Sequence, residues 1–319
     1  MTRSTPRQMA EKKLITEDEF KKIELITSGK IVSVFYELRI LLYMGVMLFA
    51  SGAGILIYQN IGELGHLASI LLLAVIMLGC FGYAIKHGHD YKNDQVESPN
   101  AYFDYVLLLG CLLFVSIQGY MQVQYDAFTQ SMLWNTLITA IFYFYIAYRY
   151  DHIGVLSLAI TALASFWGLK ISSKKWYNGD FFDQADLHIT AMVFATLLAG
   201  IVFSLDKKSI KKHFTFTYKN FCFLLFFIGA LTGIFIDSIY DLLFVSLIYV
   251  GCIFAWQQAQ QKKSFLFLVY AFTAAYIATT YLLGKYLFNS EPVLWYYYFL
   301  ISCGGIIYGI IQYKRLFKR

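Results

Sequence analysis

The feature that most limits what this chain can fold into is an uncharged stretch between Arg39 and Gln59. The stretch is nineteen residues long, and it carries small residues such as Gly45 and Gly52 along its length. At about 1.5 Å per residue, a helix of this length is sufficient for the ~30 Å hydrocarbon core of a bilayer. The stretch therefore predicts a transmembrane helix.

The composition of the whole chain extends this prediction beyond one helix. Of the 319 residues, 59% are hydrophobic and only 14% are charged, whereas soluble domains carry about 25% charged residues. The net charge of +6 does not indicate nucleic-acid binding, because the basic residues divide by predicted membrane side, as shown below. The composition predicts a polytopic membrane protein with the lipid bilayer as its surroundings.

Nine further apolar segments follow the first one, so we predict an all-α, polytopic bundle of about ten transmembrane helices with cytosolic N- and C-termini. Residues 1–39 form a cytosolic, amphipathic helical preface that Thr16 and Glu19 begin with a capping box. Residues 40–319 form the transmembrane domain. The predicted segments are Ile40–Tyr58, Leu67–Ile85, Tyr105–Met121, Met132–Tyr148, Ile153–Gly168, Leu187–Phe203, Phe221–Ile236, Leu242–Ala255, Phe265–Leu283 and Leu294–Ile311.

The placement of basic residues supports this membrane topology. With the N-terminus inside and ten alternating spans, 22 of the 26 Lys and Arg residues fall on the inner side. Cytosolic loops carry such an excess of Lys and Arg. A missed or additional span would scramble the pattern from that point onward. The charge distribution thus predicts an even number of spans.

This membrane topology predicts which side chains can be modified from outside. A membrane-impermeant thiol reagent should label a Lys175→Cys variant and leave a Lys212→Cys variant unmodified, because the two residues lie on opposite predicted sides. The reverse labelling pattern would contradict this membrane topology.

Two regions of the sequence resemble a known family. They are Leu14–Phe20, with the sequence LITEDEF, and the glycine-rich first span from Gly45 to Asn60. Together they resemble DUF2157, an uncharacterised family of bacterial membrane proteins, over about residues 10–90. Ile61 stands here where the family usually has Trp. The resemblance implies a multi-pass protein of the bacterial cytoplasmic (inner) membrane, and it implies no activity. The preface also resembles a SHOCT-type helical hairpin, which implies self-association.

Acidic residues gather at the starts of the predicted spans, and we expect most of them to cap helices. A carboxylate at a helix N-terminus accepts hydrogen bonds from unpaired amides and complements the helix dipole. The residues in these positions are Asp104, Asp151, Asp186, Asp241 and Glu291. A second interpretation is an outer acidic cluster that binds a cation such as Ca²⁺, although a solvated rim is the favoured one. That cluster comprises Asp180, Asp183, Asp186, Asp237 and Asp241.

No metal or cofactor site is predicted. The turn His87-Gly88-His89-Asp90 holds three metal-binding side chains, but a zinc site needs three or four converging ligands, and we interpret the turn as a solvated loop. The five cysteines lie in five different segments without CxxC spacing, as expected for small buried residues. Hydrolase, metalloprotease and nucleotide-binding motifs are absent.

The sequence is compatible with three functions. The first is a permease, because this size and number of spans suit alternating access. The second is a non-catalytic scaffold or sensor that self-associates or docks a protein partner through residues 1–39. An intramembrane enzyme is the least expected, since no catalytic residue is predicted. For a permease, the predicted polar lining is Gln118, Asn135, Thr280 and Tyr281.

The predicted spans also constrain the substrate. As delimited, they contain no Asp, Glu, Lys or Arg, and such groups usually mark proton relays and ion paths. A charged substrate left unpaired in the membrane would cost several kcal/mol. We therefore expect an uncharged or amphipathic substrate that moves without proton coupling through a midplane carboxylate.

Overall fold

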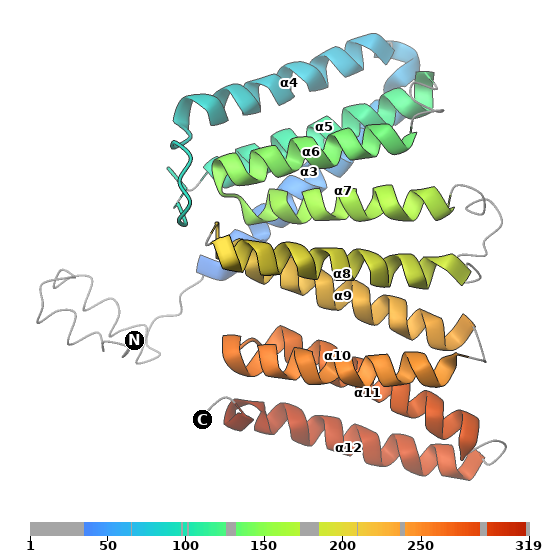
Figure 1. The fold of residues 1–319 in the computed structure, drawn as a ribbon. Helices are drawn as coiled ribbons and strands as arrows, with labels where there is room; N and C mark the ends of the chain where they lie inside the picture. The colour runs from blue at the N-terminus through green and yellow to red at the C-terminus, as the bar shows by residue number, and fades with distance from the viewer. Residues whose placement is uncertain are drawn as a thin grey trace, which may run out of the picture. The chain divides into compact units, whose positions relative to one another are not determined.

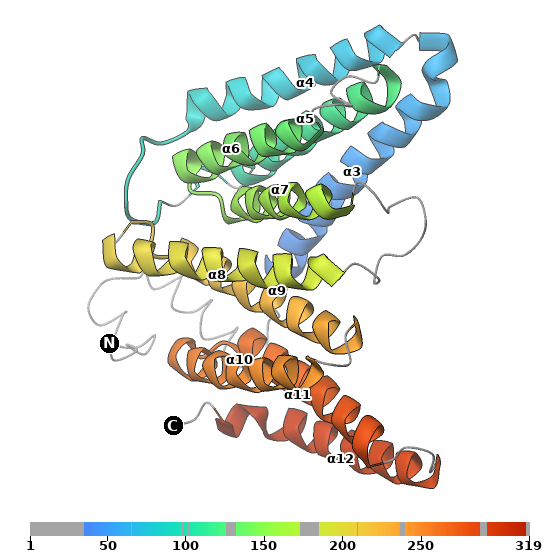
Figure 2. The ribbon, with the colours of Figure 1, turned by 45° about the vertical axis from the view of Figure 1, so that its right-hand side comes forward.

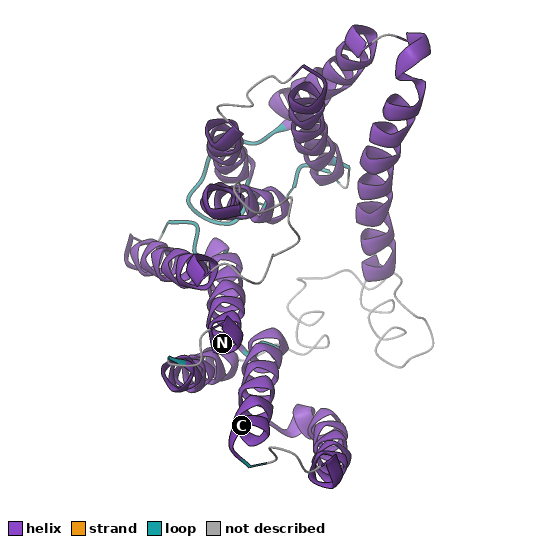
Figure 3. Ribbon diagram, turned by 90° about the vertical axis from the view of Figure 1, so that its right-hand side faces the viewer, coloured by secondary structure: helices purple, strands orange, loops and turns teal. Residues whose placement is uncertain are grey.

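The computed structural model describes residues 35–316 apart from 65, 97, 101, 126–131, 173–184, 209, 237–239 and 288–291. The helical preface lies almost entirely outside the described residues, and its capping box lies wholly outside them. Every regular element among the described residues is an α-helix (Figure 3). These helices are α3 (Phe35–Leu64), α4 (His66–His87), α5 (Phe103–Tyr125), α6 (Met132–Tyr150), α7 (Ile153–Ser172), α8 (Ala185–Lys208), α9 (Phe214–Ile236), α10 (Asp241–Lys262), α11 (Phe265–Tyr286) and α12 (Pro292–Leu316) (Figure 1).

The ten helices confirm the all-α prediction, and each predicted apolar segment lies inside one of them. The helices are longer than the segments, most clearly for α9, which begins at Phe214 rather than at the predicted Phe221. Hydropathy marks only the part of a helix that suits hydrocarbon. The backbone amides of the flanking polar residues still gain by staying in the helix.

By length and composition, six helices in the described part of the chain could cross a membrane, namely α4, α5, α8, α9, α10 and α11. Two others contain shorter apolar stretches, Ile40–Gly52 in α3 and Ile153–Gly168 in α7. Large hydrophobic side chains such as Leu72, Phe203 and Ile253 are exposed on these helices. Exposed apolar surface of this extent is typical of helices that face lipid.

The helices form two compact units. The first contains α3, α4 and most of α5. Within it, Gly110 of α5 permits close packing on α4, since a Cβ there would lie 3.1 Å from the Cβ of Cys80. Asn100 accepts the Phe103 amide at 2.9 Å, which caps α5, and donates to the Tyr83 hydroxyl at 2.8 Å. The side chain of Asn100 thus caps α5 and also bonds to α4.

The second unit contains helices α6–α12 and the loop of residues 88–99 that joins α4 to α5. Its helices are laid side by side roughly in chain order (Figures 1 and 2). Close helix packing occurs where α8, α9 and α10 meet. There the rings of His188 and Phe244 are in edge contact at 5.1 Å, beside Gly229 and Gly233 of α9. An apolar core formed by residues such as Ile234, Ile248 and Ala274 joins α9, α10 and α11.

Candidate functional site

A pocket of about 550 Å³ lies between the end of α9 and the facing sides of α11 and α12. Most of its lining is aromatic or apolar. Thr280 and Tyr281, two of the residues predicted as polar lining, both border it. The remaining lining residues are Phe235, Tyr276, Ile277, Gly284, Lys285 and Trp295.

The wall between α11 and α12 is built from hydroxyl groups and aromatic rings. Thr280 donates to the Tyr276 carbonyl at 2.7 Å. Its hydroxyl oxygen also lies 2.6 Å from the Tyr298 hydroxyl of α12, which must be the donor because the Thr280 proton is already used. The Tyr276 and Tyr298 rings stack with centroids 6.1 Å apart. These contacts fix the orientation of the hydroxyls that border the pocket.

Gly284 of α11 lets the Trp295 ring lie close to the helix at the border of the pocket. A Cβ at this position would lie 2.9 Å from the Trp295 ring, closer than side-chain atoms normally approach. The ring of Trp295 therefore lies against the bare backbone of α11, and a larger residue at position 284 would compete with the ring for the pocket space.

One ion pair borders the pocket. Lys285 of α11 donates to a carboxylate oxygen of Asp241 at 2.6 Å. The other oxygen of Asp241 accepts the Leu242 amide at 2.8 Å, and the Tyr281 hydroxyl lies 3.4 Å from the carboxylate. Asp241 is buried, whereas the Lys285 side chain is one-third exposed. The carboxylate therefore has its charge compensated within the protein.

The other predicted lining residues lie elsewhere. Asn135 lies on α6, where its carbonyl accepts the Thr139 hydroxyl, and Gln118 lies on α5 in the first unit. Neither borders the pocket that contains Thr280 and Tyr281. Their part in lining a substrate path stays a prediction.

The predicted outer acidic cluster is described at one position only. Asp180, Asp183 and Asp237 lie outside the described residues, and Asp186 lies in α8 without a described side chain. Asp241 binds Lys285, as above. Among the residues that the structure describes, no group of three or more His, Cys, Asp or Glu side chains could hold a metal ion.

A second polar site, which the sequence analysis missed, lies in the turns between helices. Asp151 follows α6, and its carboxylate contacts the Nζ of Lys211 at 3.2 Å and the His213 ring. The Val96 amide of the 88–99 loop donates to the same carboxylate at 2.6 Å. The side chains of Asp151 and Lys211 are only 2% and 1% exposed, so this is a buried ion pair with a histidine and a backbone amide around it.

The backbone of both charged residues is adapted to this arrangement. Asp151 has φ 58° and Lys211 has φ 43°, in the left-handed region. This conformation is ordinary for Asp and uncommon for Lys. The Lys211 amide also donates to the Asn93 carbonyl at 3.1 Å, and its ammonium lies 5.2 Å from the centre of the Tyr91 ring. Contacts with the 88–99 loop thus offset the cost of the turn conformation.

The prediction that Asp151 caps the following helix is wrong. Its carboxylate is turned toward Lys211 and His213, while the N-terminus of α7 is capped by His152, whose Nδ1 accepts the Val155 amide at 3.0 Å. The left-handed turn at Asp151 directs its side chain away from the helix that it precedes. Opposite charges in two successive turns on the same predicted side were the sequence signal for this pair.

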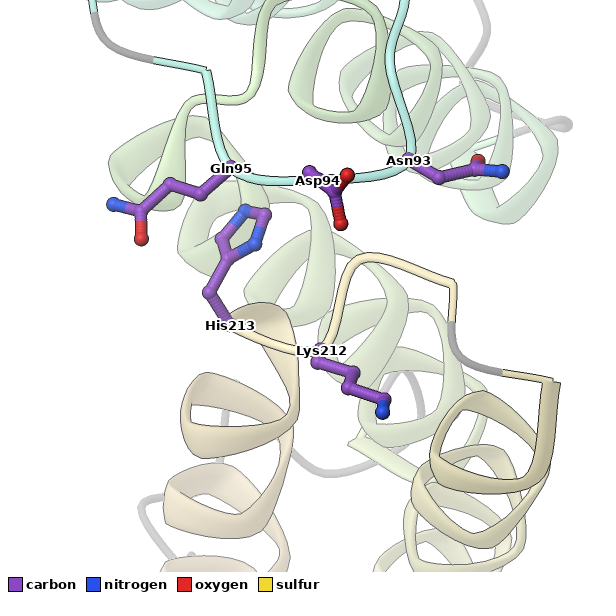
Figure 4. Close-up of a pocket in the computed structure, with 5 residues that line it drawn as sticks. All are labelled: Asn93, Asp94, Gln95, Lys212 and His213. Atoms are coloured by element: carbon purple, nitrogen blue, oxygen red, sulfur yellow. The ribbon is translucent and has the colours of Figure 1, made fainter. Parts of the chain in front are cut away.

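A small polar pocket of about 270 Å³ lies beside the ion pair. Figure 4 shows the His213 ring rising from the start of α9 toward the backbone of Asp94 and Gln95, while Lys212 points away. Lys212 is exposed although its neighbour Lys211 is buried. The pocket therefore gives solvent access to one edge of the cluster.

The match to known proteins falls on the first half of the chain. Residues 7–152 match the DUF2157 family of predicted membrane proteins. This confirms the resemblance predicted over about residues 10–90 and extends it through α5 and α6. No curated protein and no solved structure matches the chain. Together with the six apolar helices, the match identifies a membrane-embedded protein.

The DUF2157 match covers part of the buried ion cluster and none of the pocket between α9, α11 and α12. It includes the 88–99 loop and Asp151, which form one half of the buried ion cluster, and it ends at His152. Lys211 and His213, and the whole pocket between α9, α11 and α12, lie beyond it. The family description names no activity, so the function rests on the chemistry of the sites themselves.

Proposed function

We propose that the protein is permease-like and carries an uncharged or amphipathic small molecule through the pocket between α9, α11 and α12. The observation that supports this proposal is the lining of the pocket. It combines aromatic rings with the hydroxyls of Thr280 and Tyr281, which suit a molecule with an apolar body and a few hydrogen-bonding groups.

The electrostatics of the pocket favour such a ligand over an ion. Lys285 is bound to Asp241 at 2.6 Å, so the bordering charges compensate each other. A charged ligand would have to separate this pair or remain without a counter-charge, and burying an unpaired charge costs several kcal/mol. An uncharged head group can bind the hydroxyls without that cost.

A fluorescent amphipath tests the proposal. We expect purified protein to bind a short-chain, nitrobenzoxadiazole-labelled diacylglycerol and to carry it across vesicle membranes, read as the fraction that dithionite bleaches from outside. Gly284→Leu should weaken binding at least about tenfold, because the new side chain and Trp295 compete for the same space. Gly304→Leu is the matched control, since nothing lies within 4 Å of that position on α12.

Flux should not require a pH gradient. Equal binding by the two glycine variants would contradict the pocket assignment. Probe accumulation that needs an imposed gradient, and that persists after neutralising Asp237 and Asp241, would contradict transport without proton coupling.

The membrane topology is part of the same proposal. We place ten spans in the bacterial inner membrane with both termini in the cytosol, on the basis of the ten helices and the 22 inner basic residues. In this topology the pocket lies toward the outer side of the membrane, and residues 1–39 form the cytosolic preface. The labelling of Lys175→Cys and Lys212→Cys tests the orientation.

A scaffold or sensor is the second candidate, with residues 1–39 docking a partner. The observation in its favour is the packed apolar core of α9, α10 and α11 beside the pocket, where residues such as Ala230, Ile248 and Ala278 are fully buried. A solid core suits a protein that binds without transporting. Saturable probe binding without flux would favour this candidate over the permease.

A further inference from the structure

A lateral groove of about 430 Å³ runs along α9 between α8 and α10, apart from the pocket of the proposed function. Its shape follows from the packing of the three helices. Near the starts of α8 and α10, His188 and Phe244 are in contact across α9. Farther along, α8 and α10 flank α9, and the small residues Ala199 and Gly251 line the groove between them. The Phe226 ring lies against Gly251, since a Cβ there would lie 2.5 Å from it.

The groove is apolar along most of its length and open to the side. Cys222, Phe223 and Phe226 of α9 line it, together with Phe254 of α10. Phe254 is 58% exposed, on a helix whose length and composition suit a membrane span. In a bilayer this side faces lipid tails. The groove therefore has the surface and the surroundings that suit a hydrocarbon chain.

The polar lining is concentrated at one end. Lys219 and Gln258 are joined there by a hydrogen bond of 3.0 Å, and Thr196 is the other polar residue of the lining. Lys219 lies five residues after the start of α9, about 7–8 Å along the helix axis at ~1.5 Å per residue. This is the depth at which a lysine side chain reaches the membrane interface while its stem stays in apolar surroundings.

The charge at this end is cationic. Lys207 and Lys208 end α8, and Lys262 ends α10, next to Lys263. These four lysines are exposed. The acid that contacts Lys219 is Asp206, at 3.8 Å, beyond ordinary hydrogen-bond length. An ammonium has three N–H donors, and Gln258 accepts one of them.

We propose that this groove binds one acyl chain of an anionic phospholipid, with Lys219 donating to the phosphate. The apolar walls bind the chain, and the cationic end selects a net negative head group over a zwitterionic one. The site lies on α8, α9 and α10, so it does not depend on the permease proposal or on the orientation of the protein in the membrane.

Native mass spectrometry of the full-length protein in detergent tests this proposal. Dioleoyl phosphatidylglycerol and dioleoyl phosphatidylcholine are titrated separately. We expect the tightest site to prefer phosphatidylglycerol by about tenfold, because both phosphates can accept from Lys219 but only phosphatidylcholine also brings a choline cation, which the lysines at this end repel. Equal affinities of the wild-type protein for the two lipids would overturn the proposal without any variant.

Variants assign the site to this groove. Lys219→Met should reduce the preference to less than about twofold, and Lys219→Arg should keep it. Lys92→Met, an equal charge change on the exposed 88–99 loop, should also keep it. Ala199→Phe should weaken binding of both lipids by filling the groove. A preference that survives Lys219→Met, or that is lost equally in Lys92→Met, would overturn the assignment.

A competition experiment distinguishes a lipid site from a site for a free anion. Inorganic phosphate in large molar excess over the lipid should not displace phosphatidylglycerol, because it lacks the chain that the apolar walls bind. Full displacement by inorganic phosphate, with no effect of Ala199→Phe, would show a phosphate site and overturn the lipid proposal.

Discussion

Replacing Lys211 with methionine is expected to lower the free energy of unfolding by about 3–5 kcal/mol, the cost of removing one partner from a buried ion pair. Methionine keeps the unbranched stem of lysine and removes the charge. Asp151 would then stay buried at 2% exposure without its 3.2 Å cation. The 88–99 loop would lose the cation that lies against Tyr91 as well. Unfolding of the purified protein by SDS, followed by its helical circular dichroism, measures the change.

Lys212→Met is the matched control for this prediction. The two lysines are neighbours in the same turn, so the change in net charge is identical, but Lys212 is exposed. An exposed charge contributes about 0–1 kcal/mol. Equal destabilisation by the two variants would contradict the buried pair as the source of the effect.

A double variant separates the ion pair from its surroundings. Asparagine at position 151 adopts the left-handed conformation as readily as aspartate and can still accept the Val96 amide. Asp151→Asn combined with Lys211→Met should therefore cost less than the sum of the single changes, because each single change leaves one buried charge without its partner and the double change removes both charges. Additive costs would indicate that the two charges act independently.

Gly229→Ala is expected to destabilise the protein by about 1–3 kcal/mol, the usual cost of overpacking. A Cβ at position 229 would lie 2.8 Å from the His188 carbonyl oxygen and 2.9 Å from the Met192 side chain. The first of these atoms belongs to the backbone of α8, which cannot move alone. The two helices would have to separate, and the nearby contact of His188 with Phe244 would be disturbed.

Gly200→Ala provides the comparison. Gly200 also lies in a helix of this region, and nothing lies within 4 Å of a Cβ built there. Alanine at such a position should be neutral or slightly stabilising, because glycine has the lower helix propensity. The same unfolding assay compares the variants. A smaller loss for Gly229→Ala than for Gly200→Ala would contradict the close approach of α8 and α9.

The sequence predicted the local interactions of each helix. Uncharged apolar runs located all ten helices that the structure describes, because every backbone amide in hydrocarbon must be bonded within its own segment. The same runs underestimated helix length at α9, since hydropathy does not detect the polar turn that begins at Phe214. The resemblance to DUF2157, which matches residues 7–152, was likewise visible in short stretches of sequence such as Gly45–Asn60.

Other properties depend on which helix faces which. From the sequence alone, Thr280 and Asn135 are equal candidates for lining residues, yet Thr280 borders the pocket between α9, α11 and α12 and Asn135 does not border that pocket. A polar residue in an apolar stretch does not by itself indicate which way its side chain points. The position of Asp151 directly before an apolar segment likewise predicted a helix cap. Its true partner, Lys211, lies sixty residues away, and only the packing of the intervening helices brings the two charges together. Burial of such a pair depends on that packing, since neither turn alone can exclude water from its own charge.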